Sequence, residues 1–541
     1  MRKASTIQAR LSTGGMGVLS TRPLFIVLVL MLLLTPVLAR AQEATPATAP
    51  TPSEPLSATP ADKTELVIGQ VADVSTLDPQ LSTVANDVFV TFNLFDHLVR
   101  RTRELQLEPM LATEWSQVDD LTWEFKLREG VVFHNGEPFG ADDVKFTIDR
   151  TYDPEAATRV ASVFTTIAEV QVVDDLTVRF VTKAPDPLLP GRLAFYGGQM
   201  MPKAYFAEVG AEAFGQAPVG TGPVRFVERV PDERLVLERN AEYWGEPIAF
   251  ERVVYRPIPE ASARIAALET GEVDLITRVP PDQVARVSEL ENARVEQVLY
   301  NGLYVLVVNT NQPPLDDPLV RQALAYAIDR DAIVEALWNG QGTIPSGPSI
   351  PTQFAFNPDL PPLPFDPERA VQLLEEAGYD GTPVVIESTN GSITNDRPMA
   401  EAIAAMWEEV GVTVDLQIIE SSVRAEKNTA KSFLGVFWSD PTDTLTDPDG
   451  MMWRLLGPGG PQDYWRQEEW DALGAEARTS LDPAQRQANY YRMYEIFLEN
   501  YPWIPVLQPF ESYGVANTIE WYPYANQILD LRADNLALVA E

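Results

Sequence analysis

Between residues 123 and 128 every second side chain is apolar, a pattern that predicts a half-buried strand. A second short strand and a tight turn at Asn135-Gly136 are expected next, since glycine readily adopts positive φ. From about Ala141 the apolar residues recur with helical spacing, and Asp142 and Asp143 stand at the positive end of that helix. The stretch is therefore predicted to fold as strand, turn, strand and helix.

The letters VDDLT occur twice, in residues 118–125 as VDDLTWEF and in residues 173–180 as VDDLTVRF. Each copy predicts a β-hairpin with the acidic pair at its turn. The match ends there, which indicates a reused hairpin pattern and not a repeated domain.

Later segments predict helices and a parallel sheet. Three helices should begin at Asp317-Pro318, Asp366-Pro367 and Asp482-Pro483, because Asp is a good N-cap and Pro suits the first helical position. A strand over 384–389, a helix over 399–409 and a strand over 412–419 form a β-α-β unit, which builds a parallel sheet.

Two long apolar runs, residues 300–309 and 503–508, predict buried strands. The folded body is expected to open with a strand over 65–69. At 541 residues the chain has room for several domain-sized units and a large core.

The N-terminus predicts export. Arginines and a lysine precede an apolar run over 24–34, and Ala39-Arg40-Ala41 fits the small-x-small rule for cleavage. Residues 1–41 are interpreted as a signal peptide, with an uncleaved membrane anchor as the alternative. Residues 42–62 form a linker rich in Pro, Thr and Ala.

Composition excludes several kinds of protein. A net charge of −37 argues against nucleic-acid binding, because phosphates require stripes of Lys and Arg. The chain has no cysteine, so it has no disulfide, no thiolate metal site and no lipid-modified cysteine. The two histidines, His97 and His134, have no second imidazole at ligand spacing, so no metal site and no cofactor are expected.

Catalytic motifs are missing from the sequence as well. It contains neither the Gly-x-Ser-x-Gly elbow nor the His-Glu-x-x-His pair, so no catalytic residue is predicted. A secreted hydrolase stays as a remote alternative, because paired carboxylates can cleave glycosides.

The string over 123–150 resembles the signature of the bacterial peptide/nickel solute-binding proteins, extracellular family 5, and so does Gly220-Thr221-Gly222-Pro223 with Asn240 and Tyr243-Trp244 after it. The resemblance implies an α/β protein with the two-lobed type II (cluster C) periplasmic-binding fold, a strand-rich insert domain and a hinge between the lobes. Its expected parts are lobe I (63–102, 216–300 and 506–541), the insert (103–215) and lobe II (301–505).

The same resemblance implies an extracytoplasmic, monomeric binding protein of an ABC importer, in the periplasm or at the cell surface. Such a protein is not an enzyme; it captures a peptide or similar oligomeric solute and delivers it to a membrane permease. An oligosaccharide solute is the alternative.

Candidate ligand contacts follow from the resemblance and from residue chemistry. Trp438 and Asp440, with Asp443 after them, resemble the family's Trp and acid that pair with a peptide's ammonium group, although the spacing here differs. The competing interpretation is an acidic surface loop.

Dipeptide binders of the family carry an Arg after the strand that corresponds to 384–389, whereas this chain has Asn390 and Ser392 there. Without that Arg, a longer peptide or a neutral sugar is favoured over a short zwitterionic peptide. In the family two strands connect the lobes, and the resemblance implies that residues 300–309 and 503–508 are those hinge strands. Tyr304, on the first, and Tyr513, after the second, complete the predicted contacts.

Overall fold

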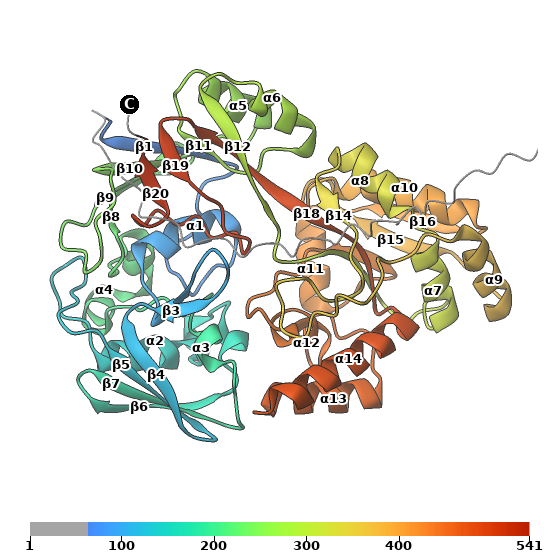
Figure 1. Cartoon of the computed structure of the whole chain (residues 1–541), viewed down its shortest axis with the longest axis horizontal. Helices are drawn as coiled ribbons and strands as arrows, with labels where there is room; N and C mark the ends of the chain where they lie inside the picture. Colours follow the sequence, from blue (N-terminus) through green and yellow to red (C-terminus); the bar gives the residue numbers. More distant parts are fainter. Residues whose placement is uncertain (1–62, 540–541) are drawn as a thin grey trace, which may run out of the picture. The chain divides into compact units, whose positions relative to one another are not determined.

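The main sheet is mixed and has twelve strands, with the central order β16-β15-β17-β13-β18-β11-β1-β10-β9-β8 (Figure 1). The computed structural model describes residues 63–539. The predicted signal peptide (1–41) and linker (42–62) lie outside the described residues. Within 63–539 there is no helix with the length and hydrophobicity needed to cross a bilayer.

One half of the sheet gathers strands from the first 300 residues. Its strands are β1 (Glu65–Gln70), β8 (Val224–Val230), β9 (Arg234–Arg239), β10 (Arg252–Pro257), β11 (Leu275–Ile276) and β12 (Ala293–Leu299). The helices α1 (Ala85–Leu94), α5 (Ala261–Glu269) and α6 (Val284–Ser288) pack on it. β1 pairs in parallel with both β10 and β11, and its apolar residues enter a core that includes Leu66, Phe89 and Tyr255.

The other half contains the predicted β-α-β unit. β15 (Val384–Ser388) and β16 (Val414–Ile418) are parallel neighbours and are connected by α10 (Asp396–Glu409), which confirms that prediction. β13 (Tyr304–Val308), β14 (Gly342–Thr343) and β17 (Val436–Ser439) complete this half. The helices here are α7 (Pro318–Tyr326), α8 (Arg330–Trp338), α9 (Pro367–Ala377), α11 (Ser421–Ala430), α12 (Met452–Leu456), α13 (Glu468–Thr479) and α14 (Pro483–Asn500).

One strand, β18 (Trp503–Ala516), belongs to both halves. Its first residues pair with β13, so that Trp503 lies opposite Val307. Its later residues pair with β12 and β11, so that Val515 lies opposite both Arg294 and Leu275. The predicted strand over 503–508 is therefore the first part of a longer one (Figure 1).

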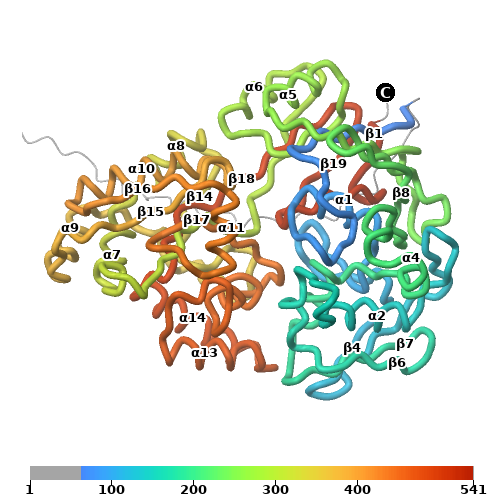
Figure 2. The backbone as a smooth tube through the Cα atoms, turned by 180° about the vertical axis from the view of Figure 1, so that it is seen from behind, coloured from blue at the N-terminus to red at the C-terminus, as the bar shows by residue number. Residues whose placement is uncertain are grey.

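A separate four-stranded sheet, ordered β4-β5-β7-β6, contains both predicted hairpins. β4 (Ala112–Asp119) and β5 (Thr122–Leu127) form one, and β6 (Ile167–Asp174) and β7 (Thr177–Thr182) form the other. The helix α2 (Ala141–Thr151) packs on β6 and β7, and α3 (Leu189–Arg192) and α4 (Lys203–Gln216) follow (Figure 2). Two short pairs, β2 (Val99–Arg101) with β3 (Leu107–Pro109) and β19 (Ile519–Trp521) with β20 (Leu536–Leu538), complete the strands.

The expected second strand between β5 and α2 does not form. The structure has there only an isolated bridge between Val132 and Pro138. The turn itself forms, with Gly136 at φ 85°. Only a few residues separate the two sides of this turn, and Pro138 offers no backbone N–H, so a ladder cannot extend.

The three predicted helix starts are confirmed, and in each of them the Asp side chain caps the helix. Asp317 accepts a hydrogen bond from the N–H of Leu319, Asp366 from that of Arg369 and Asp482 from that of Ala484. Each cap satisfies a donor that the helix cannot, and the proline that follows removes another.

Candidate functional site

A polar cavity of about 440 Å³ opens where strands of both halves of the main sheet end. Arg278 follows β11, Ser392 follows β15 and Asp440 follows β17, and all three line it. Tyr196 from the loop after α3 and Gln527 from the loop after β19 also contribute. In α/β sheets the crevice beyond the carboxyl ends of strands is the usual ligand site.

The loop that carries Asp440 is held against the start of β13. The backbone N–H of Leu303 donates to the carbonyl of Pro441 over 3.2 Å, and Gly302 forms a bridge with Thr442. A Cβ on Gly302 would collide with the carbonyl oxygen of Pro441, so this close approach requires glycine. The hydroxyl of Tyr300 donates to the backbone carbonyl of Asp440 over 2.9 Å.

The carboxylate of Asp440 is accessible from the cavity and makes no ion pair among residues 63–539. The surrounding protein mass raises its pKa by desolvation, and the charges of Arg424 and Arg278 oppose that shift. An acid in this position gains from a cationic partner, because a partner offsets the desolvation of the charged form.

Arg278 is the residue that sequence reasoning missed. It lines the cavity, where desolvation by the surrounding protein lowers the pKa of its guanidinium, but the charges of Glu511 and Asp440 outweigh that effect and raise the pKa above its ordinary value. Its only sequence signal is that an Arg stands two residues after the short apolar run that forms β11.

Asp443 does not reach the cavity. It is buried with 1% of its surface exposed, and its Oδ1 accepts from the N–H of Leu445 over 3.0 Å, while its Oδ2 has no hydrogen-bond partner among the described residues. Desolvation raises the pKa of Asp443 to about 7, opposed in part by that hydrogen bond and by Arg101.

The next two acids of this segment lie in buried ion pairs. Asp447 accepts from Arg486 over 2.5 Å and from the hydroxyl of Tyr490 over 2.9 Å. Asp449, in the short 3₁₀ turn η4 (Pro448–Gly450), accepts from Arg192 of α3 over 2.5 Å. These acids stabilise the protein and are not available to a solute.

The remaining predicted contacts are placed as follows. Trp438 is buried on β17 opposite Leu306, and its carbonyl accepts from Arg424 over 3.0 Å. Tyr304 and Tyr513 are buried and do not line the cavity. Asn390 is exposed outside the lining. Of the seven predicted residues, the structure brings Asp440 and Ser392 together at the cavity.

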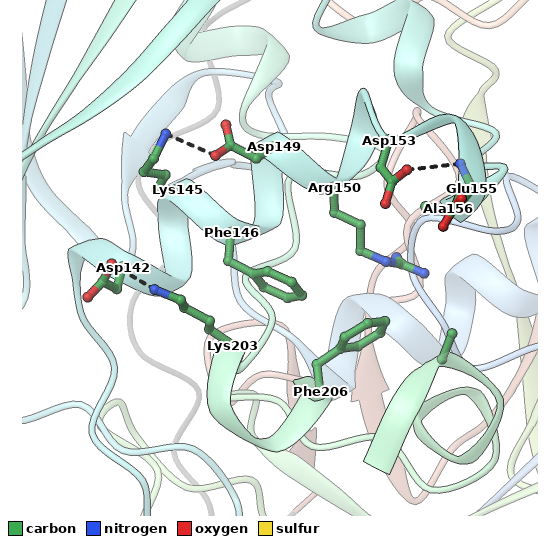
Figure 3. Close-up of a pocket in the computed structure, with 11 residues that line it drawn as sticks. Asp142, Lys145, Phe146, Asp149, Arg150, Asp153, Glu155, Ala156, Lys203 and Phe206 are labelled. Atoms are coloured by element: carbon green, nitrogen blue, oxygen red, sulfur yellow. Dashed lines mark hydrogen bonds and ion pairs between the residues drawn. The ribbon is translucent and has the colours of Figure 1, made fainter. Parts of the chain in front are cut away.

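A second cavity, of about 510 Å³, lies between α2 and α4 (Figure 3). Its floor contains Phe146 and Phe206, whose ring centroids are 5.2 Å apart. The ammonium of Lys203 lies 3.0 Å from Asp142 and that of Lys145 lies 2.9 Å from Asp149, so both lysines at this cavity are already paired with acids. We therefore place the candidate site at the polar cavity.

Neither histidine serves the polar cavity. His134 accepts the N–H of Gly220 at Nδ1, and burial lowers its pKa to about 4. Burial likewise lowers the pKa of His97, to about 3. Among residues 63–539 no three acidic or imidazole side chains converge as a metal site would require.

Comparisons with known proteins agree with this geometry. The family model described as bacterial extracellular solute-binding proteins, family 5 (middle) matches residues 106–463. The chain belongs to this family. Family 5 proteins bind solutes for transport and do not convert them, so the expectation of a binding protein that is not an enzyme is confirmed.

Individual relatives cover most of the chain. Heme-binding protein A of Haemophilus influenzae is 32% identical over 442 residues, which are 74% of this chain and 78% of the relative. The glutathione-binding protein GsiB of Pectobacterium atrosepticum is 28% identical over 455 residues, 81% of this chain and 88% of the relative.

Solved structures confirm the two-lobed fold. The periplasmic binding protein DppA from Helicobacter pylori, in complex with the peptide STSA, has a TM-score of 0.78 and 26% identity, and the alignment covers 88% of this chain and 98% of that one. A dipeptide-binding protein from Pseudoalteromonas sp. SM9913, in complex with Met-Leu, also has a TM-score of 0.78 and 26% identity, with 88% and 100% covered.

Proposed function

We propose that this family 5 protein captures peptides in the polar cavity and delivers them to the permease of an ABC importer. The observation that carries the proposal is Asp440, an acid that faces the cavity without an ion-pair partner among residues 63–539. The α-ammonium group of a peptide would supply that partner through a charge-assisted hydrogen bond.

The other predicted contacts have different proposed roles. Ser392 can donate from the cavity wall, where its hydroxyl lies 3.1 Å from that of Ser421. Trp438, Tyr304 and Tyr513 support the cavity from the buried side. Asn390 and Asp443 have no direct contact with solute in this proposal.

The titles of two similar structures name a bound peptide, and the relative GsiB is named for glutathione, which is itself a tripeptide. An oligosaccharide is less well supported, because sugar rings stack on exposed aromatic faces. Trp438, Trp453, Trp465 and Trp470 are all buried in the hydrophobic cores, which leaves Tyr196 and Tyr300 as the aromatic residues that line the cavity.

The proposal also states how the chain is divided into lobes and in which compartment the protein works. Lobe I would consist of residues 63–102, 216–300 and 506–541, the insert of 103–215 and lobe II of 301–505. Residues 1–41 would direct export, and the mature monomer would work outside the cytoplasm. The two sheets, with β18 common to both halves of the larger one, are consistent with this division.

Native mass spectrometry of the freshly purified protein tests the proposal. We expect a set of co-purified masses that fragment as peptides. A series spaced by hexose units would instead identify a sugar-binding protein.

The variant Asp440→Asn tests the residue. The carboxamide keeps the size of the side chain but removes its charge, so peptide affinity should fall by about one to two orders of magnitude while the melting temperature without peptide stays unchanged. Isothermal titration with a peptide identified by mass spectrometry measures the loss. Unchanged affinity would exclude Asp440 as the ammonium partner.

A further inference from the structure

The backbone of Arg278 is held in an uncommon conformation. Its φ is 53°, in the left-handed region that residues other than Gly, Asn and Asp seldom adopt. Neighbouring hydrogen bonds enforce it: the N–H of Thr277 donates to Gly69 of β1 over 3.1 Å, and the N–H of Val279 donates to Ser512 of β18 over 2.8 Å. Strained residues that are held from both sides concentrate at ligand sites.

A second arginine, Arg264, holds the backbone of Arg278 as well. Arg264 donates from Nη2 to the carbonyl of Arg278 over 3.1 Å, while its Nη1 donates to the carbonyls of Ile258 and Pro259. The backbone position of the residue is therefore determined by its surroundings before any solute binds.

The guanidinium of Arg278 is not engaged in the same way. It makes no ion pair and no hydrogen bond to another residue within the described part of the chain, although it is exposed at the cavity. The nearby Glu511 already accepts a hydrogen bond from Gln527 over 2.9 Å.

The other arginines near the cavity are occupied by backbone groups. Arg454 donates to the carbonyls of Gly450 and Thr442, over 2.9 and 3.3 Å. Arg424 donates to the carbonyl of Trp438. Arg278 is thus the cavity arginine whose donors are available for a solute.

The following inference rests on the proposed function. We propose that Arg278 is a specificity-determining residue that binds a free carboxylate of the solute. The preferred solutes would then be short peptides with both termini free. Asp440 would bind the ammonium end and Arg278 the carboxylate end. A guanidinium suits this role because its planar fork binds a carboxylate through two parallel hydrogen bonds.

The two groups come from different halves of the sheet, since Arg278 follows β11 and Asp440 follows β17. A zwitterionic solute would therefore connect the lobes by its two ends. After β15, where dipeptide binders of the family carry an Arg, this chain has Asn390 and Ser392. Arg278 would supply the missing cation from lobe I instead.

Three mixed-sequence tripeptide libraries test the proposal: one with free termini, one amidated at the C-terminus and one acetylated at the N-terminus. Binding is measured by affinity selection with mass spectrometry, and affinities are measured by titration with a selected sequence. Wild-type protein should prefer the free acid over its amide by about one to two orders of magnitude.

Three variants separate charge, fork geometry and backbone strain. Arg278→Gln should remove the preference for the free acid, and Arg278→Lys should retain only part of it. Arg278→Gly should also remove it while leaving the melting temperature equal or higher, because glycine tolerates positive φ. Arg369→Gln, which alters an exposed ion pair on α9, is the matched control and should change nothing.

The outcomes are distinct. If wild-type protein selects no tripeptide from any library, this inference fails, whereas the proposed function fails only if native mass spectrometry finds no co-purified peptide of any length. If it binds the free-acid and amide libraries equally, or if Arg278→Gln keeps the preference, the inference alone fails. The inference is supported if Arg278→Gln and Arg278→Gly no longer prefer the free acid over the amide, while N-acetylated peptides still bind these variants more weakly than peptides with free termini.

Discussion

Four aspartates within ten residues of one another have different environments. Asp440 faces the cavity, Asp443 is buried with one oxygen unsatisfied, and Asp447 and Asp449 are buried in ion pairs. The same residue type therefore serves binding in one place and structure in another, according to which cations lie within reach.

Asp443 should make the stability of the protein depend on pH. Its folded pKa of about 7 lies above its unfolded value of about 3.9, so the folded state binds the proton more tightly. The resulting penalty is absent below about pH 4, grows as the pH rises through about 7 and is complete above it. Asp443→Asn should remove the penalty and raise the free energy of unfolding by about 1–3 kcal/mol at pH 8.5, and by only about a third of that at pH 5.

Urea unfolding at the two pH values measures this difference. Asp447→Asn is the matched control: it weakens the pairing with Arg486 and should destabilise at pH 8.5. A variant Asp443→Asn that is less stable than wild type at pH 8.5 would contradict the assigned environment.

Sequence reasoning could rank these acids only by their spacing. The partners that decide the roles of the buried acids, such as Arg192 for Asp449 and Arg486 for Asp447, are distant in the chain and are brought close only by the fold. Arg278 had no motif of its own, because its distinguishing property is a backbone angle.

At the scale of elements, local signals were sufficient where the stabilising interaction is itself local. The hairpins and the Asp-Pro caps formed as predicted, since a turn and an N-cap involve only neighbouring residues. The extension of β18 to Ala516 was not predicted, because it depends on β11 and β12, which lie more than 200 residues earlier.

The cap of α14 gives a direct test at this scale. Asp482→Ala leaves the N–H of Ala484 without its acceptor and should lower the free energy of unfolding by about 1 kcal/mol. Asp482→Asn keeps an acceptor oxygen and should cost only a few tenths. Equal losses in the two variants, measured by urea unfolding, would show that the cap hydrogen bond is not responsible.

For the whole molecule, the dominant electrostatic property is the net charge of −37. Many exposed carboxylates repel one another in the folded state, and salt screens that repulsion. Raising sodium chloride from about 10 mM to about 300 mM should therefore raise the melting temperature by about 2–4 °C. Differential scanning calorimetry at fixed pH measures it, and a fall would mean that the surface ion pairs outweigh the repulsion.

β18 also restricts how the two lobes can move. A shift of its register by one residue would turn each side chain to the opposite face and take Trp503 and Tyr513 out of their cores. The lobes consequently cannot slide along this strand. Opening therefore requires torsion of the backbone around Gln508 and Pro509, between the segments that pair with β13 and β12, together with torsion in the second connection, residues 300–303 between β12 and β13. Each cycle of capture and release would then return every residue of β18 to the neighbour it had before.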